Sequence, residues 1–124
     1  MAILQDAHFH IVRDTLEAGS ICEVQYRYVL HCDRREIEQG EKFDCCVVLW
    51  GQHIVGDEPL GTGAYDVHSH KAGHSLLEVQ RQFVVPCHIL NEAVGLDEIF
   101  LTVICRSGSG EEVTIQTPSV SDHF

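Results

Sequence analysis

Apolar and polar side chains alternate along residues 22–32, which read Cys22-Glu23-Val24-Gln25-Tyr26-Arg27-Tyr28-Val29-Leu30-His31-Cys32. Every even position from Cys22 to Cys32 is apolar or aromatic, whereas the odd positions are mostly charged or polar. Successive side chains of a β-strand point to opposite faces of its sheet. The stretch therefore predicts a strand with one face against a core and the other against water.

Segments of β-strand character lie on both sides of this stretch, and turn residues separate them. Residues 43–50 are apolar on both faces, which is typical of a central strand that is covered on two sides. Alternating or β-branched residues also occur in segments 8–12, 64–70, 77–85, 99–106 and 113–117. The charged stretch 33–41, with Gly40 as its turn residue, is predicted to be a break between strands. A bulge or a strand end is predicted near Arg81, which interrupts an apolar face.

These segments predict an all-β fold, an antiparallel β-sandwich of about seven strands of the immunoglobulin-like class. The connections are too short for helical crossovers, so neighbouring strands are expected to be antiparallel. A small β-barrel is the alternative. The length of 124 residues fits one domain that spans 1–124. Within it, segment 1–18 mixes strand and helix signals, and segment 119–124 is expected to be a frayed tail.

The composition argues against several classes of function. Eight Lys and Arg against nineteen Asp and Glu give a formal net charge of −11, which repels nucleic acid and anionic membrane surfaces. The first residues lack the pattern of a secretory signal, so a cytoplasmic protein is expected, unless a leader has been removed. Free thiols are expected in that reducing compartment. The cysteines within β-patterned segments are predicted to pack as small apolar groups, namely Cys22, Cys45, Cys46 and Cys105.

Histidine is the residue type that most suggests a specific site, because nine occur in 124 residues. Three of them cluster as His68, His70 and His74. His68 and His70 are two residues apart on a predicted strand, so they project from the same face, as does Asp66. His74 follows the turn residue Gly73 and could return as a third ligand. These residues predict a site for Zn or another transition metal. The alternative is that they line the solvated face of the strand.

The His68-Ser69-His70 motif is similar to the first ligand pair of the cupins, small β-barrels that bind a metal. The resemblance implies a barrel with a late histidine ligand, for which His88 is the candidate. The chain departs from the cupin pattern in two places. An acidic ligand should follow the pair after three or four residues, where His74 stands instead, and the glycine expected after Pro86 is absent.

Motifs of common enzymes are missing, because the sequence contains no G-x-S-x-G, no P-loop and no dinucleotide-binding fingerprint. The leading hypothesis is a non-enzymatic protein–protein interaction or assembly module without a cofactor. Its partner would be another protein or a second copy in a homo-oligomer, because the β-rich hairpin 99–117 offers an edge for strand pairing. The alternative hypothesis is a metal-binding sandwich or barrel, or a metalloenzyme, that uses His68, His70, His74 and Asp66.

Overall fold

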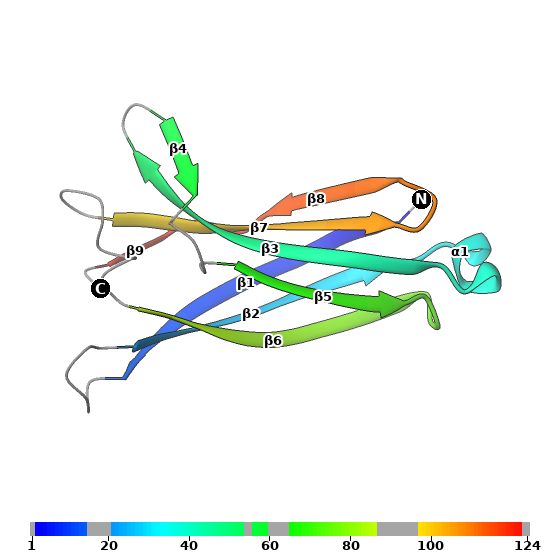
Figure 1. Cartoon of the computed structure of the whole chain (residues 1–124), viewed down its shortest axis with the longest axis horizontal. Helices are drawn as coiled ribbons and strands as arrows, with labels where there is room; N and C mark the ends of the chain where they lie inside the picture. Colours follow the sequence, from blue (N-terminus) through cyan, green and yellow to red (C-terminus); the bar gives the residue numbers. More distant parts are fainter. Residues whose placement is uncertain (1, 15–20, 54–55, 60–64, 87–96, 123–124) are drawn as a thin grey trace.

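In a computed structural model of the chain, residues 2–14, 21–53, 56–59, 65–86 and 97–122 are described, and they form two antiparallel β-sheets and one short helix. The sheets stack face to face as two layers (Figure 1). The predicted antiparallel β-sandwich is thus confirmed, and the sheets do not close into the alternative barrel. The immunoglobulin-like assignment remains a prediction. In this part of the chain, no helix is long and apolar enough to cross a membrane.

The first sheet has three strands in the order β1-β2-β6. Their bounds are β1 Ile3–Asp14, β2 Ile21–His31 and β6 Leu76–Pro86. The alternation predicted for β2 is confirmed: its even positions are buried and its odd positions are partly or fully exposed. The bulge or strand end predicted near Arg81 is wrong, because β6 pairs with β2 without interruption. A register shift occurs instead in β1, where Asp6 has a left-handed φ of 54°.

The second sheet has six strands in the order β4-β3-β7-β8, with β5 also paired to β3 and β9 to β7. Their bounds are β3 Lys42–His53, β4 Gly56–Pro59, β5 Tyr65–Lys71, β7 Asp97–Ser107, β8 Glu112–Gln116 and β9 Val120–Asp122. β3 is central as predicted, because β7 lies along one side of it and β4 and β5 along the other. The cover predicted over both faces is wrong, because the outward positions Cys46, Val48 and Trp50 stay partly exposed. The tail predicted to be frayed forms β9 at residues 120–122, where backbone pairing with β7 orders it.

A short helix, α1 (Arg34–Gln39), occupies the segment that was predicted as a charged break. The side chain of Asp33 accepts a hydrogen bond from the backbone of Glu36, and the side chain of Glu36 accepts one from the backbone of Asp33. This capping box starts the helix, and Gly40 ends it in a left-handed conformation. The helix has six residues, which is too short for an amphipathic pattern to be visible in the sequence.

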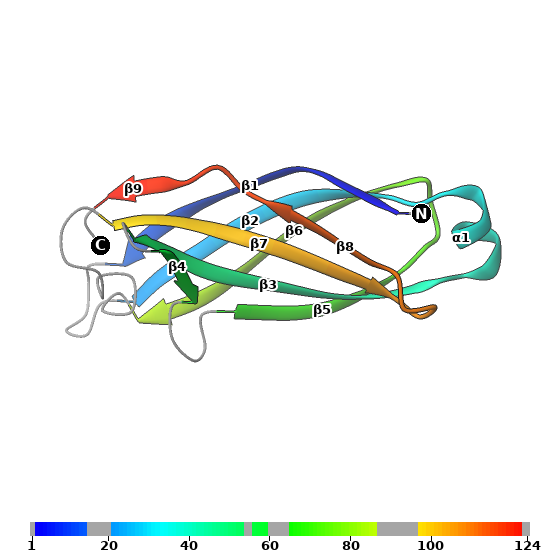
Figure 2. The same ribbon diagram turned by 90° about the horizontal axis from the view of Figure 1, so that it is seen from above.

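The hydrophobic core fills the space between the two sheets. Its largest fully buried side chains come from both layers and include Tyr28, Leu30, Phe43, Leu49, Ile99 and Leu101. In Figure 2 the strands of both layers follow the long axis of the molecule, with α1 and β9 toward opposite ends. Trp50 does not belong to this core: it is half-buried, its ring stacks on Phe100, and its Nε1 donates to Thr102.

Cys22 is disulfide-bonded, which contradicts the prediction that it packs as a free thiol. Its side chain is buried on the inner face of β2. Cys32, Cys45, Cys46 and Cys105 are free. Disulfides persist in oxidising compartments and are rare in the cytosol, so this bond counts against the expected reducing environment.

Candidate metal centre

Asp66, His68 and His70 lie on the inner side of β5 and face the opposite sheet. The burial of β5 alternates, and the outward-facing neighbours Tyr65 and Val67 are 53% and 61% exposed. The side chain of His68 is only 3% exposed. The reading in which these histidines line a solvated face is therefore wrong, since Asp66, His68 and His70 face inward while the residues between them face water.

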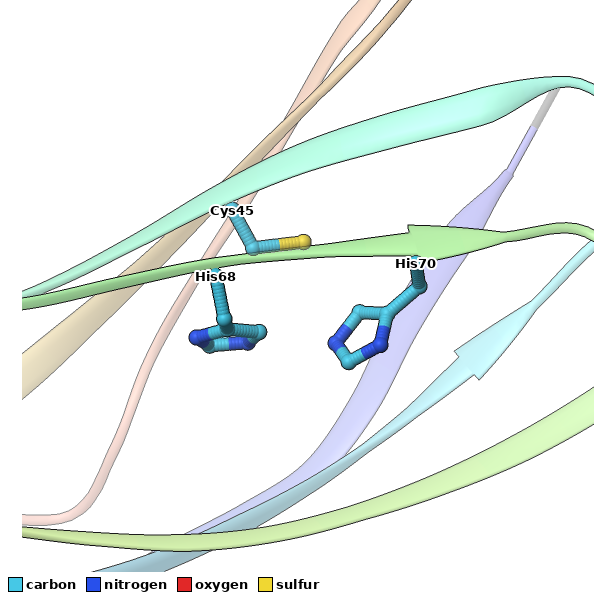
Figure 3. A group of neighbouring side chains, drawn as sticks. All are labelled: Cys45, His68 and His70. Carbon is cyan, nitrogen blue, oxygen red and sulfur yellow. The ribbon is translucent and has the colours of Figure 1, made fainter.

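Three metal-ligating side chains meet at this place, Cys45 from β3 and His68 and His70 from β5. One donor atom of each residue lies within 4.8 Å of the donor atoms of the other two. Figure 3 shows both rings on the same side of β5, with Cys45 reaching toward them from β3. Strand pairing produces this arrangement, because Cys45 is the register partner of His68 and the histidines are two residues apart. We refer to these three side chains as the donor group.

The hydroxyl of Tyr28, on β2 of the opposite sheet, contacts both histidines of the donor group. It hydrogen-bonds Nε2 of His68, and it lies 3.1 Å from Nε2 of His70. A hydroxyl has one hydrogen to donate, so it can donate to one of these neighbours at a time. The donor group thus converges on a point that is next to a single neutral hydroxyl.

A second chain of hydrogen bonds holds His68 through its other ring nitrogen. The Tyr26 hydroxyl donates to Asp66 over 2.7 Å, and its oxygen lies 3.2 Å from Nδ1 of His68. Arg81 donates to the same carboxylate oxygen of Asp66 over 3.0 Å. Because the Tyr26 hydrogen is directed at Asp66, the Tyr26 oxygen accepts from His68, which assigns the ring hydrogen to Nδ1. Nε2 of His68 therefore carries no hydrogen, and its lone pair, on the side of the donor group, accepts from the Tyr28 hydroxyl.

The surroundings of Cys45 favour a thiolate. The neighbouring Cys105 thiol, its register partner on β7, lowers the pKa of Cys45, and with smaller contributions from His68 and Tyr28 it outweighs burial. The proximity of Cys45, together with burial, raises the pKa of Cys105. Burial lowers the pKa of His70, which favours its neutral imidazole. Thiolate and neutral imidazole are the forms in which these side chains bind metals.

Two of the four residues predicted from the sequence, His68 and His70, belong to the donor group. His74 is exposed beyond the end of β5 and lies outside the group.

Asp66 faces the same interior but is bound by Tyr26 and Arg81. Burial alone would raise the pKa of the Asp66 carboxyl, but the hydrogen bonds from Tyr26 and Arg81 outweigh it and lower that pKa. His88, the candidate late ligand of the cupin pattern, lies outside the described residues.

Cys45 is not recognisable as a ligand from the sequence, which predicts that it packs as a small apolar group. The alternation within β3 puts Cys45 on one face of its strand, but it does not reveal which strand lies beside that face. The sequence feature that could have pointed to Cys45 is a turn-rich loop between β3 and β5. Such a loop makes the two strands candidates for antiparallel neighbours. Register between them was not readable from the sequence.

Comparisons with known proteins assign no relative: no protein-family model matches the chain, and no curated protein matches it. Function must therefore be inferred from the side chains and their geometry.

Proposed function

We propose that this β-sandwich protein binds one transition-metal ion through Cys45, His68 and His70. The observation that carries the proposal is the approach of the three donor atoms to within 4.8 Å of one another. A thiolate with two imidazoles suits zinc, copper and related metals, whereas Mg²⁺ and Ca²⁺ prefer oxygen ligands. Of the ligands predicted from the sequence, His68 and His70 are kept, and Cys45 takes the place of His74 and Asp66.

The hydrogen bonds around the donor group support this proposal. Metal-binding histidines commonly donate their second ring N–H to an oxygen acceptor, which fixes the tautomer and the ring orientation. Tyr26 accepts this hydrogen from His68, and Asp66 in turn orients Tyr26. All three donors are held by paired β-strands rather than by loops, so binding a metal requires little ordering of the backbone.

Metal analysis of protein purified without a histidine tag tests the proposal. We expect about one equivalent of a transition metal after reconstitution and gel filtration, and loss of that metal in Cys45→Ser and His68→Ala. Two variants serve as matched controls. Cys46→Ser alters the next thiol along β3, which pairs opposite the outward-facing Val67, and His74→Ala alters the exposed histidine. Both should retain the metal. Metal-free wild-type protein after reconstitution would overturn the proposal, as would full retention in Cys45→Ser.

A second candidate function, a protein–protein interaction or assembly module, is favoured by the outer face of the first sheet. Exposed large apolar side chains lie on this face in two groups. Ile3 and Leu76 flank His31 near one end of the sheet, and Val12 and Val84 flank Glu23 toward the other. Ordinary monomer surfaces show such residues singly, whereas grouped apolar residues mark contact sites.

A second copy of the chain is the partner that fits this arrangement. Two copies can pack these faces together about a two-fold axis that runs perpendicular to the strands. The apolar group at one end of the first copy then contacts the apolar group at the other end of the second copy. Self-complementary contact of this kind is the usual basis of homodimers. The central rows between the apolar groups carry polar side chains: His8, Arg27 and Gln80, then His10, Gln25 and Gln82.

Light scattering at micromolar concentration tests this second function. We expect a dimer that dissociates in the Leu76→Glu/Val84→Glu double variant, because a buried carboxylate on each apolar group opposes association. The matched control is Val67→Glu, which alters an equally exposed side chain on the opposite face of the molecule. A wild-type monomer at all concentrations, or equal dissociation in the control, contradicts the assignment of this face.

A further inference from the structure

The donor group supplies three ligands, only one of which is negatively charged when it binds a metal. Cys45 supplies a thiolate, and His68 and His70 supply neutral nitrogens. Soft sulfur combined with imidazole selects copper and zinc over hard cations. The choice between copper and zinc then depends on how many ligands the site offers and on the charge that surrounds them.

The number of ligands favours an ion that needs only three protein ligands. Structural zinc sites in proteins are almost always tetrahedral, with four protein ligands, and zinc sites with three protein ligands take a water as the fourth. The side chain of His68 is only 3% exposed, so this interior is not the open site that a water ligand needs. Cys105 is the register partner of Cys45 on β7, but its sulfur lies outside the set of donor atoms that approach within 4.8 Å of one another. Tyr28 offers a neutral hydroxyl, which is a weak ligand. Monovalent copper accepts trigonal coordination, and thiolate and imidazole are among the ligands that bind it.

The charge of the site favours a monovalent ion. A thiolate with Cu(I) is neutral, whereas a thiolate with Zn(II) leaves one positive charge between the sheets, where an uncompensated charge is costly. Asp66 is the carboxylate that could compensate this charge, since it lies 3.9 Å from Nδ1 of His68. Its charge is already paired with Arg81 at 3.0 Å. The pair contributes no net charge to the site.

We propose that the site is selective for Cu(I), held by Cys45, His68 and His70 as a three-coordinate ion, and that Arg81 contributes to this selectivity by neutralising Asp66. This inference rests on the proposed metal site and adds the identity of its ion. On binding, the copper–sulfur bond replaces the thiol hydrogen of Cys45. Where Cys45 is already a thiolate, as its surroundings favour, no proton is displaced; a remaining thiol hydrogen leaves as a proton to solvent, and copper keeps its oxidation state.

Two measurements on the whole protein test the identity of the ion. The protein is loaded anaerobically with Cu(I) in ascorbate, which leaves disulfides intact, and X-ray absorption spectroscopy then determines the ligands. We expect one sulfur and two nitrogens at a three-coordinate Cu(I). In competition, we expect the bound Cu(I) to resist about a hundredfold excess of Zn(II). Cys105→Ser, which keeps a polar group beside Cys45, should leave the ligand count unchanged.

The contribution of Arg81 has its own test. Arg81→Gln leaves the charge of Asp66 unpaired, so the site becomes more favourable for a divalent ion. We expect the affinity for Zn(II) to rise about tenfold while the affinity for Cu(I) changes less, because the attraction of a fixed negative charge scales with the charge of the ion. Arg106→Gln is the matched control, since it breaks the exposed pair with Glu112 and should change neither affinity.

The possible failures are distinguishable. A protein that takes up neither Cu(I) nor Zn(II) overturns the proposed metal site itself. A protein that binds Zn(II) with four ligands, loses it in Cys105→Ser and exchanges Cu(I) readily for Zn(II) retains a metal function but overturns the selectivity for Cu(I). An unchanged affinity for Zn(II) in Arg81→Gln, with Cu(I) still three-coordinate, overturns the role assigned to Arg81.

Discussion

The Tyr28 hydroxyl on β2 lies 3.1 Å from Nε2 of His70 on β5, so a polar contact joins the inner faces of the two sheets. The same hydroxyl hydrogen-bonds His68. Tyr28 is otherwise among the most deeply buried side chains of the core, at 1% exposure. The apolar core and the donor group therefore meet in one residue, and changes at Tyr28 should affect both stability and metal binding.

Tyr28→Phe should destabilise the metal-free protein by about 1–3 kcal/mol, because the ring nitrogens of His68 and His70 lose the hydroxyl as a buried hydrogen-bond partner. Urea denaturation measures this loss. If the proposed site is correct, saturating metal should restore part of the lost stability, since the ion binds the same nitrogens. Equal destabilisation with and without metal would show that the ion does not replace the hydroxyl as their partner.

Arg81→Ala should destabilise the protein more than Arg106→Ala does. Arg81 pairs with Asp66, whose side chain is 16% exposed, whereas the partner of Arg106, Glu112, is 44% exposed. Exposed ion pairs contribute about 0–1 kcal/mol, so Arg106→Ala should have little effect. Arg81→Ala leaves a largely buried carboxylate with one hydrogen bond fewer, at a cost of about 1–3 kcal/mol. Denaturation curves of the two variants with indistinguishable midpoints would contradict this ranking.

Stability should fall as the pH rises into the alkaline range. Burial raises the pKa of Cys32 above its ordinary value of 9.0 and the pKa values of Tyr26 and Tyr28 above 10.0. The unfolded chain therefore loses these protons at a lower pH than the folded protein does. The stability associated with the protonated groups is fully present below pH 9 and is lost progressively above it.

Urea midpoints from pH 8 to about pH 11 measure this alkaline loss. Cys32→Ala should lose less stability than the wild type in the lower part of that range, where a thiol titrates before the tyrosines do. Midpoints that stay constant up to about pH 11 would mean that these groups ionise equally well in the folded protein.

The disulfide of Cys22 predicts a specific pattern of thiol labelling. In denaturant without reductant, an alkylating reagent should modify Cys32, Cys45, Cys46 and Cys105 and leave Cys22 unmodified. Addition of a reductant should expose Cys22 to the reagent. Peptide mass spectrometry reads out each site, and alkylation of Cys22 before reduction would exclude the bond. In the folded protein, reduction should lower stability by about 2–5 kcal/mol, as removal of a structural disulfide usually does.

Much of the architecture was readable from local patterns. The alternation in residues 22–32 predicted the buried and exposed faces of β2 residue by residue, because side chains alternate strictly along an extended chain. The two-sided apolar pattern of 43–50 predicted the central position of β3 correctly, but the second covered face it implied is partly exposed. α1 was not predicted, although the capping pair Asp33 and Glu36 was present, because a six-residue helix has too little periodicity to be recognised.

The sequence by itself determined that His68, His70 and Asp66 share one face of a strand, since their spacing imposes it. Only the tertiary structure decided that this face is the inner one. The apolar neighbours Tyr65 and Val67 suggest the opposite, but β5 is an edge strand whose polar side chains find hydrogen-bond partners on the facing sheet. Register between β3 and β5 then decided that Cys45 lies beside His68. Such register depends on contacts between segments far apart in the chain, and local periodicity contains no information about them.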